Sequence, residues 1–495
     1  MLFNSIDFLL FFPLVTLIYF LIPHKIRYIW LLLASYYFYM CWNPKYALLM
    51  LTSTLITYAS GLLIAKAGEK GKTKRKKLYV ALSFISNLAI LFLFKYFHFV
   101  VININRVLDA VGFSLITPRF SPLLPVGISF YTFQALSYTM DVYRKHVKVE
   151  KNFLRYALFV SFFPQLVAGP IERSSNLLGQ MYERHSFDRK RVARGLQLML
   201  WGYFQKLVIA DRAAYFVNAV YNSPEAESST GLIVVLATVL FAFQIYCDFS
   251  SYSDIARGAA EVMGFSLMLN FNTPYFSRSV AEFWRRWHIS LSSWFRDYLY
   301  IPLGGNRKGK FRKYVNLMIV FLVSGLWHGA SWNFVIWGGL NGFYQVIGEL
   351  TAKPRRLLRE KLGGGRDNFS TKLGQMLITF ALVCFSWVFF RANGTREAFV
   401  LIGAMFSEFN PWVFTDGTLF SLGLDGADMF VLFSALLVLL LVSVAKYNNV
   451  RIRNWLAEQG LWFRYTVYLT AIFSVMIFGI YGAQFDAAQF IYFQF

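Results

Sequence analysis

Residues 429–445 read MFVLFSALLVLLLVSVA, an apolar run without a charged side chain. Similar runs recur along the chain, close to the length that a helix needs to cross a bilayer. Because lipid cannot hydrogen-bond to the backbone, such segments must be helices. The sequence therefore predicts an all-α polytopic integral membrane protein with about 11–12 transmembrane helices. The predicted spans lie near residues 7–22, 28–42, 46–65, 78–102, 123–142, 195–221, 230–248, 314–327, 331–349, 372–390, 429–445 and 462–482.

Composition and charge agree with a membrane location. The chain is 57% hydrophobic and 19% aromatic, whereas soluble proteins are about 45–50% apolar. Its net charge of +23 would suggest nucleic acid in a soluble protein, but the cations lie in short loops between apolar runs. The positive-inside rule accounts for them if those loops face the cytoplasm. This topology places both termini outside the cytoplasm, and we expect no nucleic-acid partner.

The N-terminal run has no basic leader and no cleavage pattern, so we expect it to stay in the membrane as the first span. The whole chain, residues 1–495, is predicted to form a single membrane domain. Neither the three isolated cysteines nor the six histidines have the spacing of a metal site, so no metal is predicted.

The middle third departs from simple spans and loops. Residues 144–194 and 248–313 are too polar for plain spans but keep apolar residues at helical spacing, which predicts interfacial or re-entrant helices. The clearest example, EFWRRWHISLSSWFRDYLYIPLGGNR at 282–307, reads as one amphipathic helix. An in-plane anchor would show the same pattern. Its aromatic stripe is Trp284, Trp287, Leu291 and Trp294, and its cationic stripe is Arg285, His288, Ser292 and Arg296.

His328 is the most informative ionisable residue. It lies in VSGLWHGASWNF, residues 323–334, inside otherwise apolar sequence. An ionisable group among membrane helices is a functional-site candidate, and a neutral imidazole can accept a proton near neutral pH. The small neighbours predict close helix packing, and Trp332 is predicted to share the helical face of His328 at i+4. A histidine hydrogen-bonded to an adjacent helix would also fit the local sequence.

A second polar group lies further upstream, in QIYCDFSSYSDIARGAAEVMGF at 244–265. Asp248 begins a series of polar residues at helical spacing. Asp254, Arg257 and Glu261 follow at steps of three and four residues, which predicts that these three charges pair with one another.

Several long motifs, in order, resemble the membrane-bound O-acyltransferase (MBOAT) family, specifically the bacterial branch of alginate O-acetylation proteins and teichoic acid D-alanyl transferases. They define a core at residues 125–342. The resemblance implies a ring of helices around a central tunnel in the bacterial plasma membrane. The motifs are PVGISFYTFQALSYTMDVYR (125–144), FPQLVAGPIER (163–173), QIYCDFSSYSDIARG (244–258), FNTPYFSRSVAEFWRRWHISLSSWFRDYLYIPLGGNR (271–307) and SGLWHGASWNFVIWGGLNG (324–342).

The resemblance also implies a reaction. His328 matches the catalytic histidine of the family and His288 its second characteristic histidine. An acyl group, with acetyl favoured, would pass from a cytoplasmic thioester donor to a polysaccharide outside the cell. The expected donor is acetyl-CoA or an acyl carrier protein, used as a substrate and not as a bound cofactor, and the expected partner is an extracytoplasmic SGNH-type acetyltransferase. Substrate contacts are predicted for Trp327, Trp332, Arg285 and Asp248.

The C-terminal tail, residues 484–495, carries a further resemblance. Phe490, Tyr492 and Phe495 form the pattern F-x-Y-x-x-F, which is similar to the C-terminal motif of the small companion peptide in the D-alanyl system. The resemblance implies that Tyr492 relays the acyl group. An amphipathic tail anchored at the membrane interface is the alternative.

Three other functions are compatible with parts of the sequence. One is D-alanyl transfer from a carrier protein to teichoic acid. Another is a polysaccharide transporter or flippase with proton-relaying histidines, but the sequence lacks the paired interrupted helices expected of many transporters. The third is an inert scaffold, which the intact His288 and His328 argue against.

Overall fold

The computed structural model describes residues 1–118, 124–222, 230–361, 368–407 and 409–481, and within these ranges the regular structure is entirely helical. The prediction of an all-α fold is confirmed. In the part of the chain that the structure describes, six helical segments are long and apolar enough to cross a membrane, and the other six predicted spans also form helices. The six segments are Pro44–Glu69, Thr73–Ala110, Gly231–Met263, Phe369–Arg391, Gly426–Tyr447 and Leu461–Phe478.

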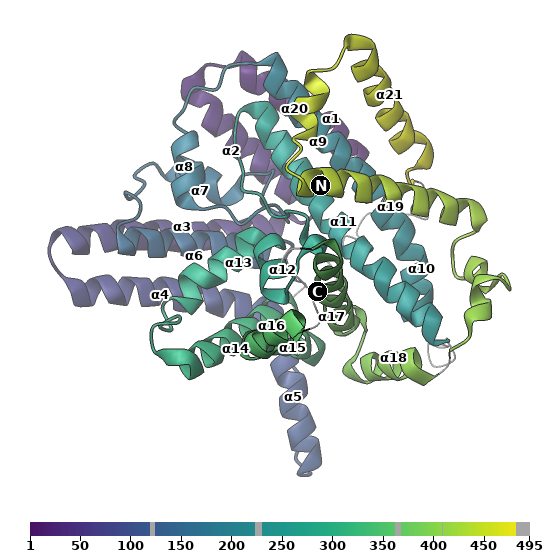
Figure 1. Cartoon of the computed structure of the whole chain (residues 1–495). Helices are drawn as coiled ribbons and strands as arrows, with labels where there is room; N and C mark the ends of the chain where they lie inside the picture. Colours follow the sequence, from purple (N-terminus) through teal and green to yellow (C-terminus); the bar gives the residue numbers. More distant parts are fainter. Residues whose placement is uncertain (119–123, 223–229, 362–367, 408, 482–495) are drawn as a thin grey trace. The chain divides into compact units, whose positions relative to one another are not determined.

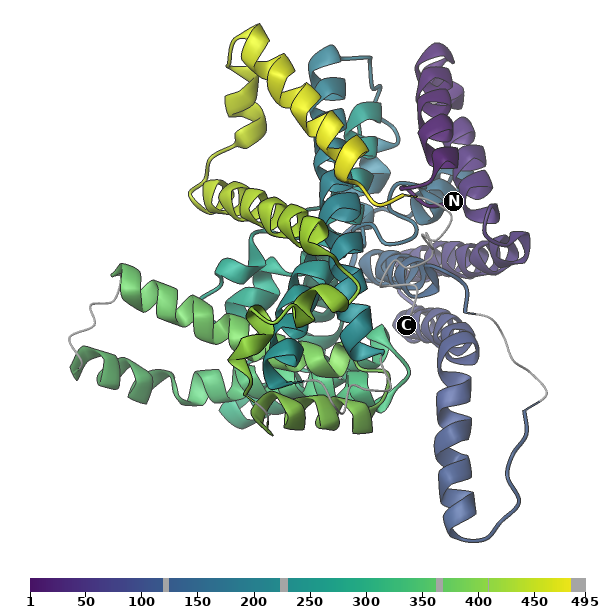
Figure 2. The ribbon, with the colours of Figure 1, turned by 90° about the vertical axis from the view of Figure 1, so that its right-hand side faces the viewer.

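The described chain forms two compact units. The first comprises residues 1–199 and 253–268. In it, α3 and α4 form an antiparallel hairpin against which α6 packs (Figure 1), while α5 continues from the end of α4 away from this hairpin (Figure 2). Its helices are α1 (Ile6–Leu21), α2 (His24–Met40), α3 (Pro44–Glu69), α4 (Thr73–Leu91), α5 (Phe97–Ala110), α6 (Ile128–Arg144), α7 (Phe153–Ser161), α8 (Ser174–Gln180) and most of α9 (Arg189–Tyr203).

Buried polar side chains join the helices of this unit. Ser83 of α4 lies 3.2 Å from the hydroxyl of Thr139 of α6, and Tyr156 of α7 donates a 2.8 Å hydrogen bond to Thr57 of α3. Such bonds between helices are common in membrane proteins, where small and hydroxyl residues occupy helix contacts.

The second unit comprises residues 200–252 and 269–495. A π-helical turn, η2 (Phe204–Ala210), leads from α9 into α10. The remaining elements are α10 (Asp211–Tyr221), α11 (Gly231–Met263, whose last residues belong to the first unit), η4 (Pro274–Phe276), α12 (Val280–Arg286), α13 (Ile289–Phe295), η5 (Arg296–Tyr300), α14 (Gly309–His328), α15 (Trp332–Leu350), α16 (Ala352–Lys361), α17 (Phe369–Arg391), α18 (Thr395–Ser407), η6 (Pro411–Phe414), η7 (Thr418–Ser421), α19 (Gly426–Tyr447), α20 (Ile452–Ala457) and α21 (Leu461–Phe478).

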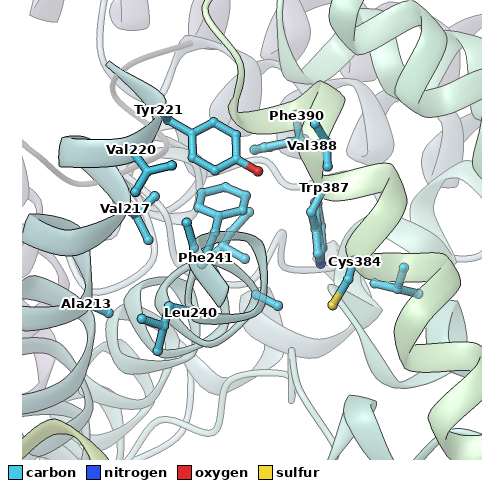
Figure 3. Close-up of a cluster of buried hydrophobic side chains, with 14 of the residues drawn as sticks. Ala213, Val217, Val220, Tyr221, Leu240, Phe241, Cys384, Trp387, Val388 and Phe390 are labelled. Atoms are coloured by element: carbon cyan, nitrogen blue, oxygen red, sulfur yellow. The ribbon is translucent and has the colours of Figure 1, made fainter. Parts of the chain in front are cut away.

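The core of the second unit is aromatic and lies between α10, α11 and α17. Figure 3 shows Tyr221 above Phe241, with Trp387 of α17 facing both. The ring centroids of Phe241 and Trp387 lie 6.4 Å apart in an edge-on arrangement that aromatic pairs favour. Trp387 in turn stacks on Trp337 of α15 at 5.7 Å. This core therefore connects α10 to the helices that carry the candidate site.

Candidate active site

The backbone places His328 at the end of a helix. His328 is the last residue of α14, and the chain then becomes extended at Gly329 before Ser331 caps α15 by accepting a 3.2 Å hydrogen bond from the backbone of Asn333. The prediction that Trp332 shares a helical face with His328 is therefore wrong. Because the helix ends between them, the two residues do not share a helical face.

Glycines hold α14 and α15 together at backbone distance. A Cβ on Gly325 would lie 2.2 Å from the carbonyl oxygen of Phe334, and a Cβ on Gly338 would lie 2.3 Å from that of Phe321. A real side chain cannot occupy either position unless the helices separate. The prediction that small residues near His328 allow close packing is thus confirmed, and this packing sets the direction in which α14 presents His328.

His288 lies at a break between two short helices. α12 ends at Arg286 and α13 begins at Ile289, while His288 itself adopts a left-handed conformation with φ 45° and ψ 53°. The prediction of one continuous amphipathic helix at 282–307 is wrong for this reason. The aromatic stripe faces the protein interior, with Trp287 and Leu291 each 1% exposed, and His288 is fully buried instead of lying on an exposed cationic stripe.

Asn270 fixes the break from the preceding loop. Its backbone carbonyl accepts a 3.0 Å hydrogen bond from the N–H of Ile289, and its side-chain oxygen accepts a 2.7 Å bond from the hydroxyl of Ser290. These bonds satisfy groups at the start of α13 that would otherwise lack partners. They hold the unusual backbone of His288, since left-handed conformations are costly for residues other than glycine.

The two histidines meet inside the second unit. Their ring centroids lie 6.4 Å apart, although the residues are separated by forty positions. Trp327 lies against both, with its ring 5.0 Å from that of His328 and 6.1 Å from that of His288. Both histidines are buried, with exposed fractions of 5% for His328 and 0% for His288. The sequence prediction that both belong to a site is consistent with this juxtaposition.

Aromatic rings enclose the pair. Trp337 of α15 and Phe390 of α17 lie 4.9 and 5.6 Å from the His328 ring, and Phe249 of α11 lies 4.6 Å from the His288 ring. These three residues were not singled out from the sequence. Trp337 and Phe249 fall within the quoted motifs, but their periodicity is that of ordinary packing, so only the tertiary contacts distinguish them.

Burial controls the protonation of His288, which lies outside the helices long enough to span a membrane. Removal from solvent lowers the pKa of His288 from its ordinary value to about 3, because burial disfavours the charged imidazolium. The ring therefore stays neutral at physiological pH, in the form that can both donate and accept a hydrogen bond.

This lowered pKa predicts a pH-dependent stability. Below pH 6.5 the unfolded chain binds a proton at residue 288 that the folded chain does not, so stability is complete above pH 6.5 and falls as the pH drops toward 3. At one pH unit below the ordinary pKa the loss is about 1.4 kcal/mol. His288→Asn, which tolerates a left-handed backbone, should flatten the decline in melting temperature between pH 7 and 5. An equally steep decline in this variant would contradict the assignment, and His146→Gln at an exposed side chain is the control.

The other predicted site residues differ in whether they contact the histidine pair. Trp327 is 3% exposed and contacts both histidines, whereas Trp332 at the start of α15 is 49% exposed. Arg285 is exposed near the end of α12. Tyr492 and the rest of the tail lie outside the described residues.

Asp248 belongs to a buried ion-pair network. Its carboxylate lies 2.5 Å from the ammonium of Lys206, which also lies 2.8 Å from the carboxylate of Asp211. These contacts join α11 to η2 and to the start of α10. Asp248 is adjacent in sequence to Phe249, so the network holds the segment of α11 that contacts His288.

The predicted pairing downstream on α11 is partly confirmed. Asp254 and Arg257 form a 3.2 Å ion pair, as expected, but Glu261 lies 3.8 Å from Arg194 of α9. Among the described residues, no group of three or more histidine, cysteine or acidic side chains could hold a metal ion.

Comparison with known proteins identifies the class. The model of the membrane-bound O-acyltransferase family matches residues 18–359, so the chain belongs to this family. It is 38% identical to a probable alginate O-acetylase of Pseudomonas aeruginosa, over 91% of this chain and 82% of that protein. It is 35% identical to a peptidoglycan O-acetyltransferase of Helicobacter pylori, over 76% of this chain and 73% of that protein. It is 27% identical to a teichoic acid D-alanyltransferase of Bacillus subtilis, over 54% of this chain and 68% of that protein. The protein is a membrane-bound acyltransferase.

Proposed function

We propose that this protein transfers an acetyl group from acetyl-CoA on the cytoplasmic side of the plasma membrane toward a cell-envelope polysaccharide outside. The observation that carries the proposal is the buried pair His288 and His328, 6.4 Å apart inside an aromatic enclosure. The names of two relatives, a probable alginate O-acetylase and a peptidoglycan O-acetyltransferase, support the acetyl group and the class of acceptor.

In the proposed reaction, His328 is the general base. An acceptor hydroxyl gives its proton to the neutral imidazole as its oxygen attacks the thioester carbonyl carbon. The new C–O bond forms, the C–S bond breaks, and the proton passes from His328 to the departing thiolate. The N–H of His288 donates a hydrogen bond to the carbonyl oxygen as negative charge develops there.

The surrounding rings support this chemistry physically. Trp327, Trp337 and Phe390 exclude water from the imidazole of His328. Electrostatic interactions strengthen in such a low-dielectric site, and exclusion of water protects the thioester from hydrolysis. In this proposal Trp327 also contacts the substrate, while Arg285 and its neighbours attract the anionic donor at the cytoplasmic mouth.

Tyr492 is the proposed first acceptor. The topology that places the cationic loops in the cytoplasm places the tail outside, where the phenol could take the acetyl group and present it to a separate SGNH-type acetyltransferase for transfer to the polymer. Asp248, whose carboxylate is paired with Lys206, is assigned a supporting role and not a substrate contact.

Mass spectrometry of the purified protein tests donor, base and relay together. After incubation with acetyl-CoA, an acetyl group should appear on the C-terminal peptide of the wild type and of the control Tyr481→Phe. It should be absent from His328→Ala and Tyr492→Phe, because one lacks the base and the other the acceptor. Equal labelling of the C-terminal peptide in Tyr492→Phe would overturn the relay.

D-alanyl transfer is the second candidate, because relatives with that name cover about half of the chain. The same experiment separates the two. A folded wild type that acetyl-CoA does not label, but that a D-alanyl carrier protein does, would replace acetyl transfer with D-alanyl transfer.

A further inference from the structure

The second unit contains an apolar cavity of about 480 Å³ apart from the histidine pair. It is lined by the N-terminal half of α17, by residues 433–443 of α19, and by parts of α11 and η4. Aliphatic and aromatic side chains line it, together with the small hydroxyl residues Thr273 and Ser443. A site of this character suits a hydrocarbon ligand.

The cavity opens on the surface of this unit between two helices that can cross a membrane. Leu377 of α17 and Leu437 of α19 line it and are 59% and 56% exposed. In a bilayer the medium around these side chains is lipid. On α19 the lining residues run from Phe433 to Ser443, a rise of about 15 Å at 1.5 Å per residue. That length equals half of the roughly 30 Å hydrocarbon core, which is the depth of one leaflet.

Cationic residues gather at one end of this cavity. Lys446 follows Ser443 by three positions on α19, and Lys372 immediately precedes the lining residue Leu373 on α17. Lys372 lies at the N-terminal end of α17 and Lys446 at the C-terminal end of α19, next to the segments of these helices that line the cavity. Arg278 lies two positions beyond the lining residue Phe276 and is exposed.

Ring contacts strengthen this end of the cavity. Tyr447 stacks on Phe276 with ring centroids 5.2 Å apart, and the guanidinium of Arg286 lies 5.6 Å from the centre of the Tyr447 ring. Residues of α12, η4 and α19 therefore meet here. Because Arg286 forms a 2.9 Å ion pair with Glu282, the positive charge at this end comes from Lys446 and Arg278.

We propose that the cavity binds one acyl chain of an anionic phospholipid, with the phosphate beside Lys446 and Arg278. The predicted topology places residue 446 at the cytoplasmic face, where anionic lipids attract basic residues. This site is separate from acyl transfer and does not depend on the identity of the donor.

The same geometry brings the lipid near the histidine pair. Tyr275 and Tyr246 line the cavity, and their ring centroids lie 5.5 Å apart. The centroid of the Trp287 ring lies 6.0 Å from that of Tyr275 and 6.1 Å from that of Tyr246. Trp287 directly precedes His288. The bound chain thus packs against the layer of rings that supports the break between α12 and α13.

Native mass spectrometry in detergent tests the proposal with dioleoyl phosphatidylglycerol and dioleoyl phosphatidylcholine as the probes. The wild type should retain phosphatidylglycerol in preference to phosphatidylcholine. Leu436→Trp fills the cavity and should abolish this retention. Lys446→Gln removes an exposed cation and should weaken this retention about fivefold, the loss expected for one basic residue near a lipid surface. Its melting temperature should stay within a few degrees of the wild type.

Two variants serve as controls. Leu469→Trp adds the same side chain to an exposed position of α21, and Lys353→Gln removes a cation from α16, so both should retain the lipid as the wild type does. Equal retention of the two lipids, or unchanged retention in Leu436→Trp, would overturn the proposal. A wild-type dimer that Leu436→Trp converts to a monomer would also overturn it, because a second copy of the chain would then cover the cavity.

Discussion

Replacing His328 with glutamine is expected to lower the turnover number of acyl transfer by a factor of about 10²–10⁴, the usual contribution of a general base. Glutamine can occupy much of the space beside Trp337 and Phe390, which contact the imidazole ring. It cannot take up a proton at neutral pH. The defect should therefore fall on the chemical step, measured as release of free CoA thiol from acetyl-CoA.

Two measurements make this result specific. The melting temperature of the variant should stay within a few degrees of the wild type, since a loss of structure would also abolish activity. His146→Gln, where the side chain is 62% exposed, should release thiol at the wild-type rate. Wild-type turnover in folded His328→Gln would show that another group removes the proton and would end the proposed mechanism.

Gly338→Ala is expected to destabilise the close packing of α14 against α15, as Gly325→Ala would. Its Cβ would lie 2.3 Å from the carbonyl oxygen of Phe321 and 3.2 Å from the Cα of Gly325. Both obstacles are backbone atoms, which cannot move aside as a flexible side chain can. Overpacking of this kind typically costs about 1–3 kcal/mol, and separation of the helices would also move His328.

Gly339 provides a control one residue away. A Cβ there would meet only the Leu322 side chain at 3.6 Å, an ordinary contact. Gly339→Ala should be neutral or stabilise the protein by about 0.5–1 kcal/mol, because alanine restricts the unfolded chain and favours helix. Thermal unfolding in detergent would compare the two variants. Equal melting temperatures would show that α14 and α15 are not packed as closely as described.

The helical architecture could be predicted because apolar runs and loop charges are local properties of the sequence. The ends of the helices near the site could not be predicted in this way. The periodicity of residues 282–307 indicated one helix, yet bonds to Asn270 favour a break at His288. Those bonds join segments about twenty residues apart, and no helical periodicity encodes them.

Ion pairs could be predicted only between residues close together in the sequence. Asp254 and Arg257 pair as their spacing indicates, whereas Asp248 pairs with Lys206, forty-two residues earlier in the chain. The candidate site shows the same division. The two histidines were identifiable as unusual residues, but the rings of Phe249 and Phe390 come from different helices and join the site only through the fold.

Position 288 is restricted in two independent ways, by its left-handed backbone and by the proposed role of its imidazole. A φ of 45° is accessible to glycine, asparagine, aspartate and histidine far more readily than to β-branched residues. In the proposed mechanism, substitutions there would thus divide into two groups: those that the chain cannot accommodate, and those that give an abundant but inactive protein. Substitutions at this single position would therefore report separately on folding and on catalysis, which few buried positions allow.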